Sequence, residues 1–253
     1  MTAKTEFRQE QFASAFPIGL DAHYWNLVRN RIILDRVRRL GGGRVLDVGC
    51  GPGIVVDYLR RRGVDCRGVE LAPLNVSEHL NEFIRTGMAA QDLPEAERNS
   101  TNIIILGDVI EHLPEPAEFL RLLSGTFPNL KAFIIAVPAR RELWSNYDIY
   151  YGHFRRYDLA LARSTIASAG LTTIDAQYLF RLLYLPARLV LAITGRRRTG
   201  IKAPVRMSKV AHKIISYLLL ADAFGLPNGL PGTSVLITAS GRPATAQAIL
   251  PGS

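Results

Sequence analysis

The sequence predicts an α/β fold with a mostly parallel seven-stranded sheet, helices on both faces and a helical insertion before the last strand. Three observations favour this fold. Apolar runs of strand length alternate with stretches of helical spacing, a glycine-rich turn follows the first run, and residues 179–233 form a helical insertion between two strand-like segments. At 253 residues with 48% hydrophobic residues, the chain can bury one substantial core, so we expect one domain with additions.

The expected elements follow in chain order. Asp21 is positioned to cap a helix over about 22–40, which three consecutive glycines at 41–43 end. The remaining expected elements are strand 44–48, helix 54–62, strand 66–70, helix 73–86, strand 87–92, strand 102–106, strand 131–138, helix 159–169 and strands 171–178 and 234–240. The unbroken apolar runs at 102–106 and 131–138 are typical of parallel strands buried on both faces.

A glycine-rich turn follows the first strand and organises the rest of the chain. The apolar run 45–48 ends in Gly49, Gly51 and Gly53, after which helical spacing begins at Ile54. Glycine suits such a turn because the backbone needs unusual dihedral angles, and because a side chain would block a ligand lying at the helix N-terminus. The turn therefore predicts a cradle for a nucleotide-like ligand.

The spacing of the turn indicates which ligand it holds. A dinucleotide fingerprint, G-x-G-x-x-G, would place its third glycine at position 54, where this chain has Ile54. A nicotinamide-dependent oxidoreductase is therefore the alternative rather than the first choice. Glu70 ends the next apolar segment, 21 positions after Gly49, where a carboxylate can accept both hydroxyls of a ribose.

The segment D-V-G-C-G-P-G at 47–53 closely resembles the first motif of class I S-adenosylmethionine (SAM) methyltransferases. The later segments D-V-I-E-H-L at 108–113, L-W-S-x-x-D-x-x-x-G-H-x-R-R-Y at 143–157 and L-P-G-T-S-V-L-I at 230–237 extend the likeness. Over roughly 21–242 the chain resembles bacterial class I methyltransferases of the type 11, 12 or 23 domain group. The resemblance implies a Rossmann-like fold and SAM as cofactor.

The resemblance also implies a set of cofactor-binding residues around the glycine turn and the ends of the following strands. The set comprises Asp47, Gly49, Cys50, Gly51, Gly53, Glu70, Leu71, Gln91, Asp92, Gly107 and Asp108. We divide the chain into N-terminal lid helices (1–40), a SAM-binding core (41–178), a basic and apolar insertion that covers the substrate (179–233), and the last strand with a tail (234–253).

Two histidines are the candidate catalytic residues. Methyl transfer from a sulfonium is an in-line displacement, so the protein aligns the acceptor and, for a hydroxyl, removes its proton. His112 follows the fourth strand and His153 lies in the loop after the fifth, where Asp148 can orient it. Each histidine has an alternative structural role: His112 can hold the cofactor or loop, and His153 can pin its loop.

Metal and anion binding are alternatives in the same region. We assign no residue to a metal, but Asp108, Glu111 and His112 are similar to the E-x-x-E-H ligands of small-RNA 2′-O-methyltransferases and some ubiquinone-pathway O-methyltransferases, with His153 as a possible fourth ligand. The neighbouring Arg155 and Arg156 form either a fork for an anionic acceptor or salt bridges within the protein.

Composition indicates where the protein works. Two cysteines, Cys50 and Cys66, offer neither a disulfide framework nor metal spacing, and the polar residues 1–11 contain no signal peptide. With no apolar run long enough to span a bilayer, we expect a cytoplasmic protein.

The net charge of +9 comes from one segment. Residues 179–213 contain nine Lys and Arg residues and no Asp or Glu. The segment is also rich in Leu, Ile and Val, and its basic residues are interleaved with aliphatic rather than stacking aromatic side chains, which favours an anionic membrane or an anionic acceptor over nucleic acid. Its residues are Arg181, Arg188, Arg196, Arg197, Arg198, Lys202, Arg206, Lys209 and Lys213, with Leu182, Leu183, Leu185, Leu189, Val190, Leu191 and Ile193 among them. An ordinary lid that buries this apolar stripe is the simpler expectation.

The function expected from these features is SAM-dependent O-methylation of a small-molecule or glycan-type acceptor, or of a lipid-linked one. N- or C-methylation of a small molecule and a non-catalytic SAM-binding protein are the alternatives. Peripheral contact with the inner membrane through 179–213 is part of the same hypothesis. The acceptor and the oligomeric state are not indicated by the sequence.

Overall fold

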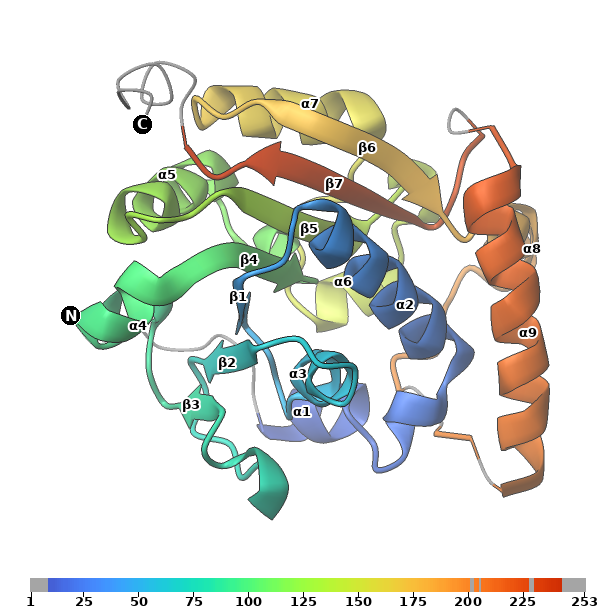
Figure 1. Ribbon diagram of the computed structural model, residues 1–253. Helices are drawn as coiled ribbons and strands as arrows, with labels where there is room; N and C mark the ends of the chain where they lie inside the picture. Colours follow the sequence, from blue (N-terminus) through green and yellow to red (C-terminus); the bar gives the residue numbers. More distant parts are fainter. Residues whose placement is uncertain (1–8, 201–202, 205, 228–229, 243–253) are drawn as a thin grey trace.

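Seven strands form one sheet in the order β3-β2-β1-β4-β5-β7-β6 (Figure 1). The computed structural model describes residues 9–200, 203–204, 206–227 and 230–242. The strands are β1 (Arg44–Val48), β2 (Cys66–Glu70), β3 (Ile84–Thr86), β4 (Thr101–Gly107), β5 (Ala132–Pro138), β6 (Thr173–Leu179) and β7 (Ser234–Ser240). Strands β1 to β5 are parallel, and β7 runs antiparallel between β5 and β6. The predicted fold class is confirmed.

Helices cover both faces of this sheet. They are α1 (Gln9–Ala15), α2 (Tyr24–Arg39), α3 (Ile54–Arg60), α4 (Glu95–Ser100), α5 (Pro116–Thr126), α6 (Asn146–Tyr150), α7 (Leu159–Ser168), α8 (Tyr184–Thr194) and α9 (Arg206–Gly225). Because side chains alternate along a strand, Ile104 and Leu106 of β4 join the core under α5 and α7, whereas Ile103 and Ile105 join the core under α2, α3 and α9. Both cores are therefore built from the same buried strands.

The region between β2 and β4 differs from the prediction. The expected helix over 73–86 is wrong, because only a short 3₁₀ turn forms at Glu78–Leu80 before β3. The expected strand at 87–92 is also wrong, because the third strand lies earlier, at Ile84–Thr86, and a 3₁₀ turn occupies Ala90–Asp92. Ile84 pairs with Gly68 of β2 and is buried against the glycine turn, so tertiary packing decides where the strand lies.

Helix α2 begins two residues later than predicted. Its N-terminus is capped by the His23 side chain, whose Nδ1 accepts a hydrogen bond from the backbone N–H of Trp25 at 3.3 Å. Asp21 instead lies in the preceding 3₁₀ turn, Leu20–Ala22. A histidine cap carries no conventional sequence signal, since Ser, Thr, Asp and Asn are the usual residues there.

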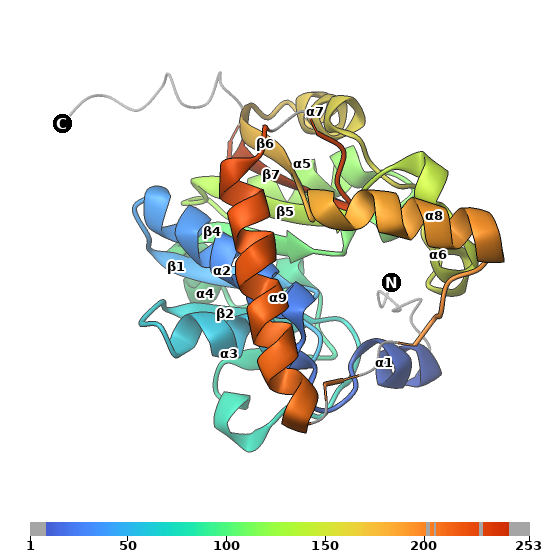
Figure 2. The same ribbon diagram turned by 90° about the vertical axis from the view of Figure 1, so that its right-hand side faces the viewer.

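The predicted insertion is helical and contains α8 and α9 (Figure 2). Helix α9 packs beside α2, with Leu219 and Ala223 buried in the shared core. Helix α8 contacts the turn after β5, where the Tyr184 hydroxyl donates to Glu142 at 2.7 Å. Both helices lie near the carboxyl ends of the parallel strands (Figures 1 and 2). Within the described part of the chain, no helix is long and apolar enough to cross a membrane.

Candidate functional site

The glycine turn after β1 is closed so tightly that side chains cannot be added. Gly53 has a φ of 90°, and a Cβ there would lie 2.3 Å from the Ile84 Cδ1 atom. Gly51 has a φ of 53°, and a Cβ there would lie 2.9 Å from the Phe16 ring. The first contact explains why β3 must sit where it does. The second shows that the segment after α1 lies against the turn.

Glu70 links this turn to the loop after β2. The backbone N–H of Gly51 donates to Oε2 of Glu70 at 2.9 Å, and that of Ala72 donates to Oε1 at 2.9 Å. Glu70 is buried, with 7% of the residue exposed. Each oxygen retains one lone pair for a further donor. The role predicted for Glu70, accepting ribose hydroxyls, stays a prediction, and the structure places the carboxylate directly beside the glycine turn.

Two aspartates near the centre of the sheet differ in their partners. Asp47 on β1 is buried, and its Oδ2 has no hydrogen-bond partner among the described residues. Burial raises the pKa of Asp47 to about 7, and Glu70 adds to the rise while Arg29 opposes it. Asp108 has a φ of 56° and forms an ion pair with Arg29 of α2. Gly107 lies under the same guanidinium.

The other predicted cofactor residues are placed less directly. The thiol of Cys50 packs into the core beside Gly68, so only backbone atoms of Cys50 remain for a ligand. Leu71 and Gln91 are half-buried and Asp92 is exposed, in the loops that follow β2 and β3. Their assignment as cofactor contacts stays a prediction. Both cysteines are buried free thiols.

The two predicted catalytic histidines come together. The rings of His112 and His153 have centroids 4.7 Å apart and lie nearly perpendicular. Backbone bonds hold the two loops in register, because the Phe154 N–H donates to the Glu111 carbonyl at 2.8 Å and the Tyr157 N–H donates to the Pro138 carbonyl at 2.9 Å. Two motifs that are 41 positions apart in the sequence thus form one site.

Asp148 orients His153, as predicted. Its Oδ1 lies 2.9 Å from Nδ1 of His153 and accepts from Nε of Arg156 at 2.7 Å. Burial alone would raise the pKa of Asp148, but the hydrogen bonds from His153 and Arg156 outweigh it and lower the pKa to about 2. An ionised Asp148 can only accept, so Nδ1 of His153 carries a proton and Nε2 is left to accept one.

His112 is a weak base. Burial, and then the neighbouring His153, lower the pKa of His112 to about 4, although Asp108 and hydrogen bonds to the backbone of Tyr151 and Gly152 act in the opposite direction. The ring is therefore neutral at physiological pH. A neutral imidazole can accept a hydrogen bond or bind a metal ion.

Glu111 is the least satisfied group of the site. It is fully buried, and neither carboxylate oxygen has a hydrogen-bond partner within the described ranges. Burial, and then the charge of Asp108, raise the pKa of Glu111 well above its usual range. The backbone amide of Glu111, Arg29 and Arg156 lower this pKa, but by less. A buried carboxylate without a partner is costly and calls for a proton or a cation.

Three side chains of this cluster can hold a metal ion together. One ligand atom from each of Glu111, His112 and His153 lies within 4.8 Å of the others. Asp108, the fourth residue weighed from the sequence, is engaged by Arg29 instead. The donor set of two imidazoles and one carboxylate suits Zn²⁺ or Fe²⁺ better than Mg²⁺.

A comparison with known protein families agrees with the glycine turn, the acidic residue after β2 and the strand order. A methyltransferase domain model of the type 23 group matches residues 24–174, more than half of the chain. The chain belongs to this methyltransferase family. The matched range includes the glycine turn, the Glu111–His112 segment and His153, and S-adenosylmethionine is the cofactor of the class I methyltransferases whose fold it shares.

Curated relatives match part of this methyltransferase. The chain is 31% identical over 107 residues to the ubiquinone biosynthesis O-methyltransferase of Acinetobacter baylyi, covering 39% of this chain and 45% of the relative. It is 31% identical over 123 residues to the enzyme of the same name from Aeromonas salmonicida, covering 46% and 52%. The chain thus spans about half the length of the curated relatives it matches.

Solved structures support the fold over most of the chain. A protein of Galdieria sulphuraria named as a sarcosine dimethylglycine methyltransferase superposes with a TM-score of 0.52 at 14% identity, covering 86% of each chain. The methyltransferase domain of a bacterial Hen1 protein, CtHen1-CN, superposes with a TM-score of 0.50 at 11% identity, covering 85% of this chain and 98% of that one. At such identities the likeness concerns the fold alone.

Residues outside the recognised motifs complete the site of the methyltransferase. Arg29 projects from α2 to Asp108, and Phe16 covers Gly51 from the N-terminal segment. Tyr147 of α6 lies with its ring centroid 6.1 Å from that of His153. No sequence signal marked Arg29 or Phe16, because both act through tertiary contacts with distant loops. Tyr147 lay in the aromatic loop that the sequence marked only as a whole.

Proposed function

We propose that this methyltransferase transfers a methyl group from S-adenosylmethionine to a hydroxyl oxygen of a small-molecule or glycan-type acceptor. The observation that carries the proposal is the Asp148–His153 pair, which lies at the same edge of the sheet as the glycine turn. The naming of relatives as O-methyltransferases supports oxygen as the methylated atom. The cofactor, when bound, supplies an electrophilic methyl group on a sulfonium.

The residues of the chain provide binding and proton removal. The turn of Gly49, Gly51 and Gly53, with the carboxylate of Glu70, forms the cradle for the cofactor. His153, held by Asp148 through Nδ1, presents Nε2 to take the proton of the acceptor hydroxyl. His112 has a pKa of about 4 and is therefore a poor base at neutral pH. Its role is to hold the acceptor in place.

A second candidate adds a divalent metal ion to the same reaction. The observation that favours it is the buried Glu111 carboxylate, which has no hydrogen-bond partner among the described residues and faces His112 and His153 within 4.8 Å. A cation there would neutralise Glu111 and lower the pKa of a bound hydroxyl. Treatment with a chelator, followed by addition of Zn²⁺, Fe²⁺, Mn²⁺ or Mg²⁺, separates the two candidates. If the chelated protein keeps its turnover, the reaction needs no metal and His153 acts as the base without one.

The experiment that tests the proposed reaction is untargeted mass spectrometry of a cell extract incubated with the protein and isotopically labelled SAM. We expect one labelled acceptor carrying an O-methyl group. His153→Ala should then lose about 100-fold or more in turnover, as general-base variants do, with SAM affinity unchanged. An N- or C-methylated product, or full turnover by both His153→Ala and His112→Ala, would overturn the assignment of oxygen and of the base.

We also propose that α8 and α9 attach the protein to an anionic membrane surface. The expectation of an ordinary lid that buries its apolar stripe is wrong for α8, because Leu185, Leu189 and Ile193 are 71%, 61% and 75% exposed. Ile214 and Leu218 of α9 are 57% and 61% exposed. Exposed aliphatic side chains next to cations are the pattern of a peripheral membrane surface.

A basic groove beside α9 fits an anionic lipid headgroup. The groove has a volume of about 530 Å³ and lies between α9 and the helices α2 and α3. Its lining includes four cations and no carboxylate, namely Arg31, Arg62, Lys209 and Lys213. Each cation near an anionic surface contributes about 1 kcal/mol to attachment. The side chains of Lys202 and Arg206, also part of the basic segment, lie outside the described residues.

Liposome co-sedimentation at low and physiological salt tests the membrane proposal. We expect binding to vesicles containing anionic lipid and none to neutral vesicles. Ile193→Ser and Lys213→Glu should each reduce binding. The matched changes Ile174→Ser on β6 and Lys131→Glu just before β5 should not, because these exposed positions lie outside α8 and α9. Absence of binding to anionic vesicles at either salt would leave α8 and α9 as a lid without a membrane partner.

A further inference from the structure

The arginines nearest the site are almost all engaged by the protein itself. Arg156 donates to Asp148 and, at 3.0 Å, to the Ala139 carbonyl, and it is buried. Arg155 donates to the carbonyls of Leu113 and Pro114 at 3.2 and 2.6 Å. The anion fork weighed from the sequence for these two residues is therefore absent, since both hold the loop after β5 in place.

Arg197, in the connection between α8 and α9, is different. Its backbone is clamped by Asn146, whose Nδ2 donates to the Arg197 carbonyl at 2.9 Å and whose Oδ1 accepts from the Arg197 N–H at 2.8 Å. Nearby, the Tyr151 hydroxyl donates to the Thr199 carbonyl at 2.8 Å. Backbone contacts alone thus anchor this segment beside α6, and the guanidinium is not needed for anchoring.

The Arg197 guanidinium lies over the ring of Tyr147, a neighbour of His153. Its Cζ lies 4.8 Å from the centroid of the Tyr147 ring, and that ring is also 6.1 Å from the His153 ring. Tyr147 is therefore a neighbour of both Arg197 and the proposed base. The side chain of Arg197 remains accessible to solvent. Among the described residues it has no carboxylate within ion-pair distance.

The electrostatic surroundings favour an anion at this point. Surrounding protein, and then the nearby charge of Arg156, lower the pKa of Arg197, so its charge is disfavoured where it lies. The carboxylate of Asp148 already pairs with Arg156 and is hydrogen-bonded to His153. A further anion beside Arg197 would relieve this imbalance without displacing any pair in the protein.

We propose that Arg197 binds a carboxylate or phosphate group of the acceptor and so selects hydroxy compounds that carry an anionic group. This inference rests on the proposed function, since it names the acceptor class of the same site. The guanidinium fork, stacked on Tyr147, takes the anion, while the hydroxyl of the same acceptor lies toward His153. One cation of the basic segment 179–213 then has a specific task in acceptor selection.

Matched pairs of probes test this assignment by binding rather than by turnover. The pairs are 3,4-dihydroxybenzoate with catechol for a carboxylate and phenyl phosphate with phenol for a phosphate, titrated calorimetrically with and without S-adenosylhomocysteine. We expect the wild-type protein to bind at least one anion about tenfold more tightly than its neutral partner. Which pair shows the preference distinguishes the carboxylate from the phosphate.

Three variants localise the effect. Arg197→Gln should abolish the preference for the anion, Arg197→Lys should keep part of it, and the neighbouring Arg198→Gln should leave it intact. Unchanged S-adenosylhomocysteine affinity shows that each variant is folded. The proposal is overturned if the wild-type protein prefers neither anion or if Arg197→Gln keeps the preference. If the wild-type protein does not bind S-adenosylhomocysteine, the proposed function is contradicted. The anion titration without this nucleoside would still decide the role of Arg197.

Discussion

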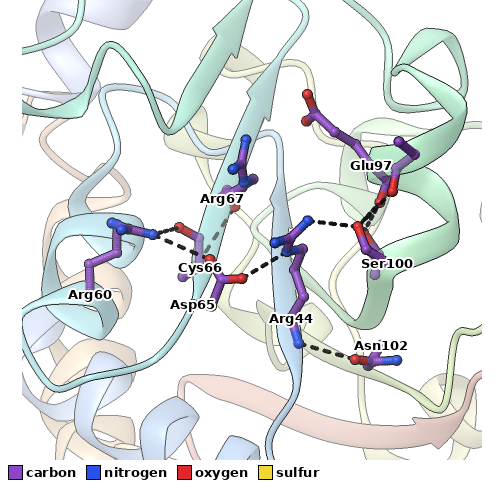
Figure 3. Close-up of polar contacts among 10 residues, drawn as sticks. Arg44, Arg60, Asp65, Cys66, Arg67, Glu97, Ser100 and Asn102 are labelled. Carbon is purple, nitrogen blue, oxygen red and sulfur yellow. Dashed lines mark hydrogen bonds and ion pairs between the residues drawn. The ribbon is translucent and has the colours of Figure 1, made fainter.

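The two ends of the parallel strands are built for different purposes. At the amino ends of β1, β2 and β4, Arg44 donates to Asp65 at 2.8 Å and to Ser100 at 2.8 Å, and its backbone N–H donates to Asn102 at 3.1 Å (Figure 3). At the carboxyl ends, the buried Glu111 has no hydrogen-bond partner among the described residues, and neither has Oδ2 of Asp47. At the amino edge, Arg44 joins Asp65, Ser100 and Asn102 in one network, whereas at the carboxyl edge two buried carboxylates lack partners for one or both oxygens among the described residues.

The pKa shifts of two carboxylates show the same difference. At the amino edge, partial burial raises the pKa of Asp65, but the hydrogen bond and charge of Arg44 outweigh it and the pKa is lowered. At the carboxyl edge, burial and Asp108 dominate, so the pKa of Glu111 is raised well above its usual range. The buried carboxylate at the carboxyl edge therefore lowers the stability of the fold. Groups with perturbed pKa values of this kind are typical of functional sites.

Removing the carboxylate beside the glycine turn should have the largest effect on the cofactor. Glu70→Ala loses the acceptor for the Gly51 and Ala72 N–H groups and the proposed contact with the ribose. We expect SAM affinity to fall by about 1.5–3 kcal/mol, the range for a charge-assisted hydrogen bond. Isothermal titration calorimetry measures this loss. Equal affinity in Glu70→Ala would remove Glu70 from the cofactor site.

Neutralising the unpaired carboxylate should separate stability from function. Glu111→Gln removes a buried carboxyl group whose ionisation is disfavoured in the folded protein, so we expect the ligand-free protein to gain about 1–3 kcal/mol in free energy of unfolding. Turnover should fall at the same time, because His112 and His153 lose their carboxylate neighbour. Denaturant unfolding and the labelled-SAM assay measure the two effects. A variant that is less stable than wild type would show that Glu111 is satisfied in solution.

The pH dependence of stability should reflect Asp47. Its pKa of about 7 in the folded protein lies above the ordinary value of 3.8, so the folded state binds more protons between these values and stability falls as pH rises through that window. The slope is up to about 1.4 kcal/mol per pH unit for one such group. Thermal unfolding from pH 4.5 to 7.5 should therefore show a steeper decline for wild type than for Asp47→Asn. Parallel curves would mean that Asp47 is ionised throughout.

A change at the amino edge is the control with the smallest effect. Asp65→Asn weakens an exposed ion pair with Arg44, which contributes about 0.2–1 kcal/mol to stability. We expect a slightly lower unfolding temperature and unchanged SAM affinity. A large loss of SAM affinity in this variant would show that the two edges are coupled.

The sequence predicted most of the fold because buried parallel strands leave plain apolar runs. All seven strands were expected, and six of them lie where the runs are. The third strand was misplaced and the helix expected before it is wrong, because β3 has only three residues and packs through Ile84 against Gly53. A single contact between distant residues leaves no periodic signal in the sequence.

The site was predictable where a motif carried it and not where packing did. The approach of His112 to His153 followed from their places after the neighbouring strands β4 and β5, and the pairing of His153 with Asp148 followed from their place in one loop. The partners of Arg155 and Arg156 could not be chosen, since carbonyl acceptors such as those of Leu113 and Pro114 are present in every residue. The position of Arg197 depends on a clamp from Asn146, 51 residues away.

Hydrogen–deuterium exchange with and without S-adenosylhomocysteine tests the central claim, that the carboxyl edge binds the cofactor and the amino edge serves the fold. Peptides covering 47–53, 70–72 and 107–113 should become more protected on addition of the nucleoside. Peptides covering 60–67 and 98–102 at the amino edge should exchange equally in both conditions. Protection confined to the amino edge, or no change at 47–53 at saturating nucleoside, would contradict the account.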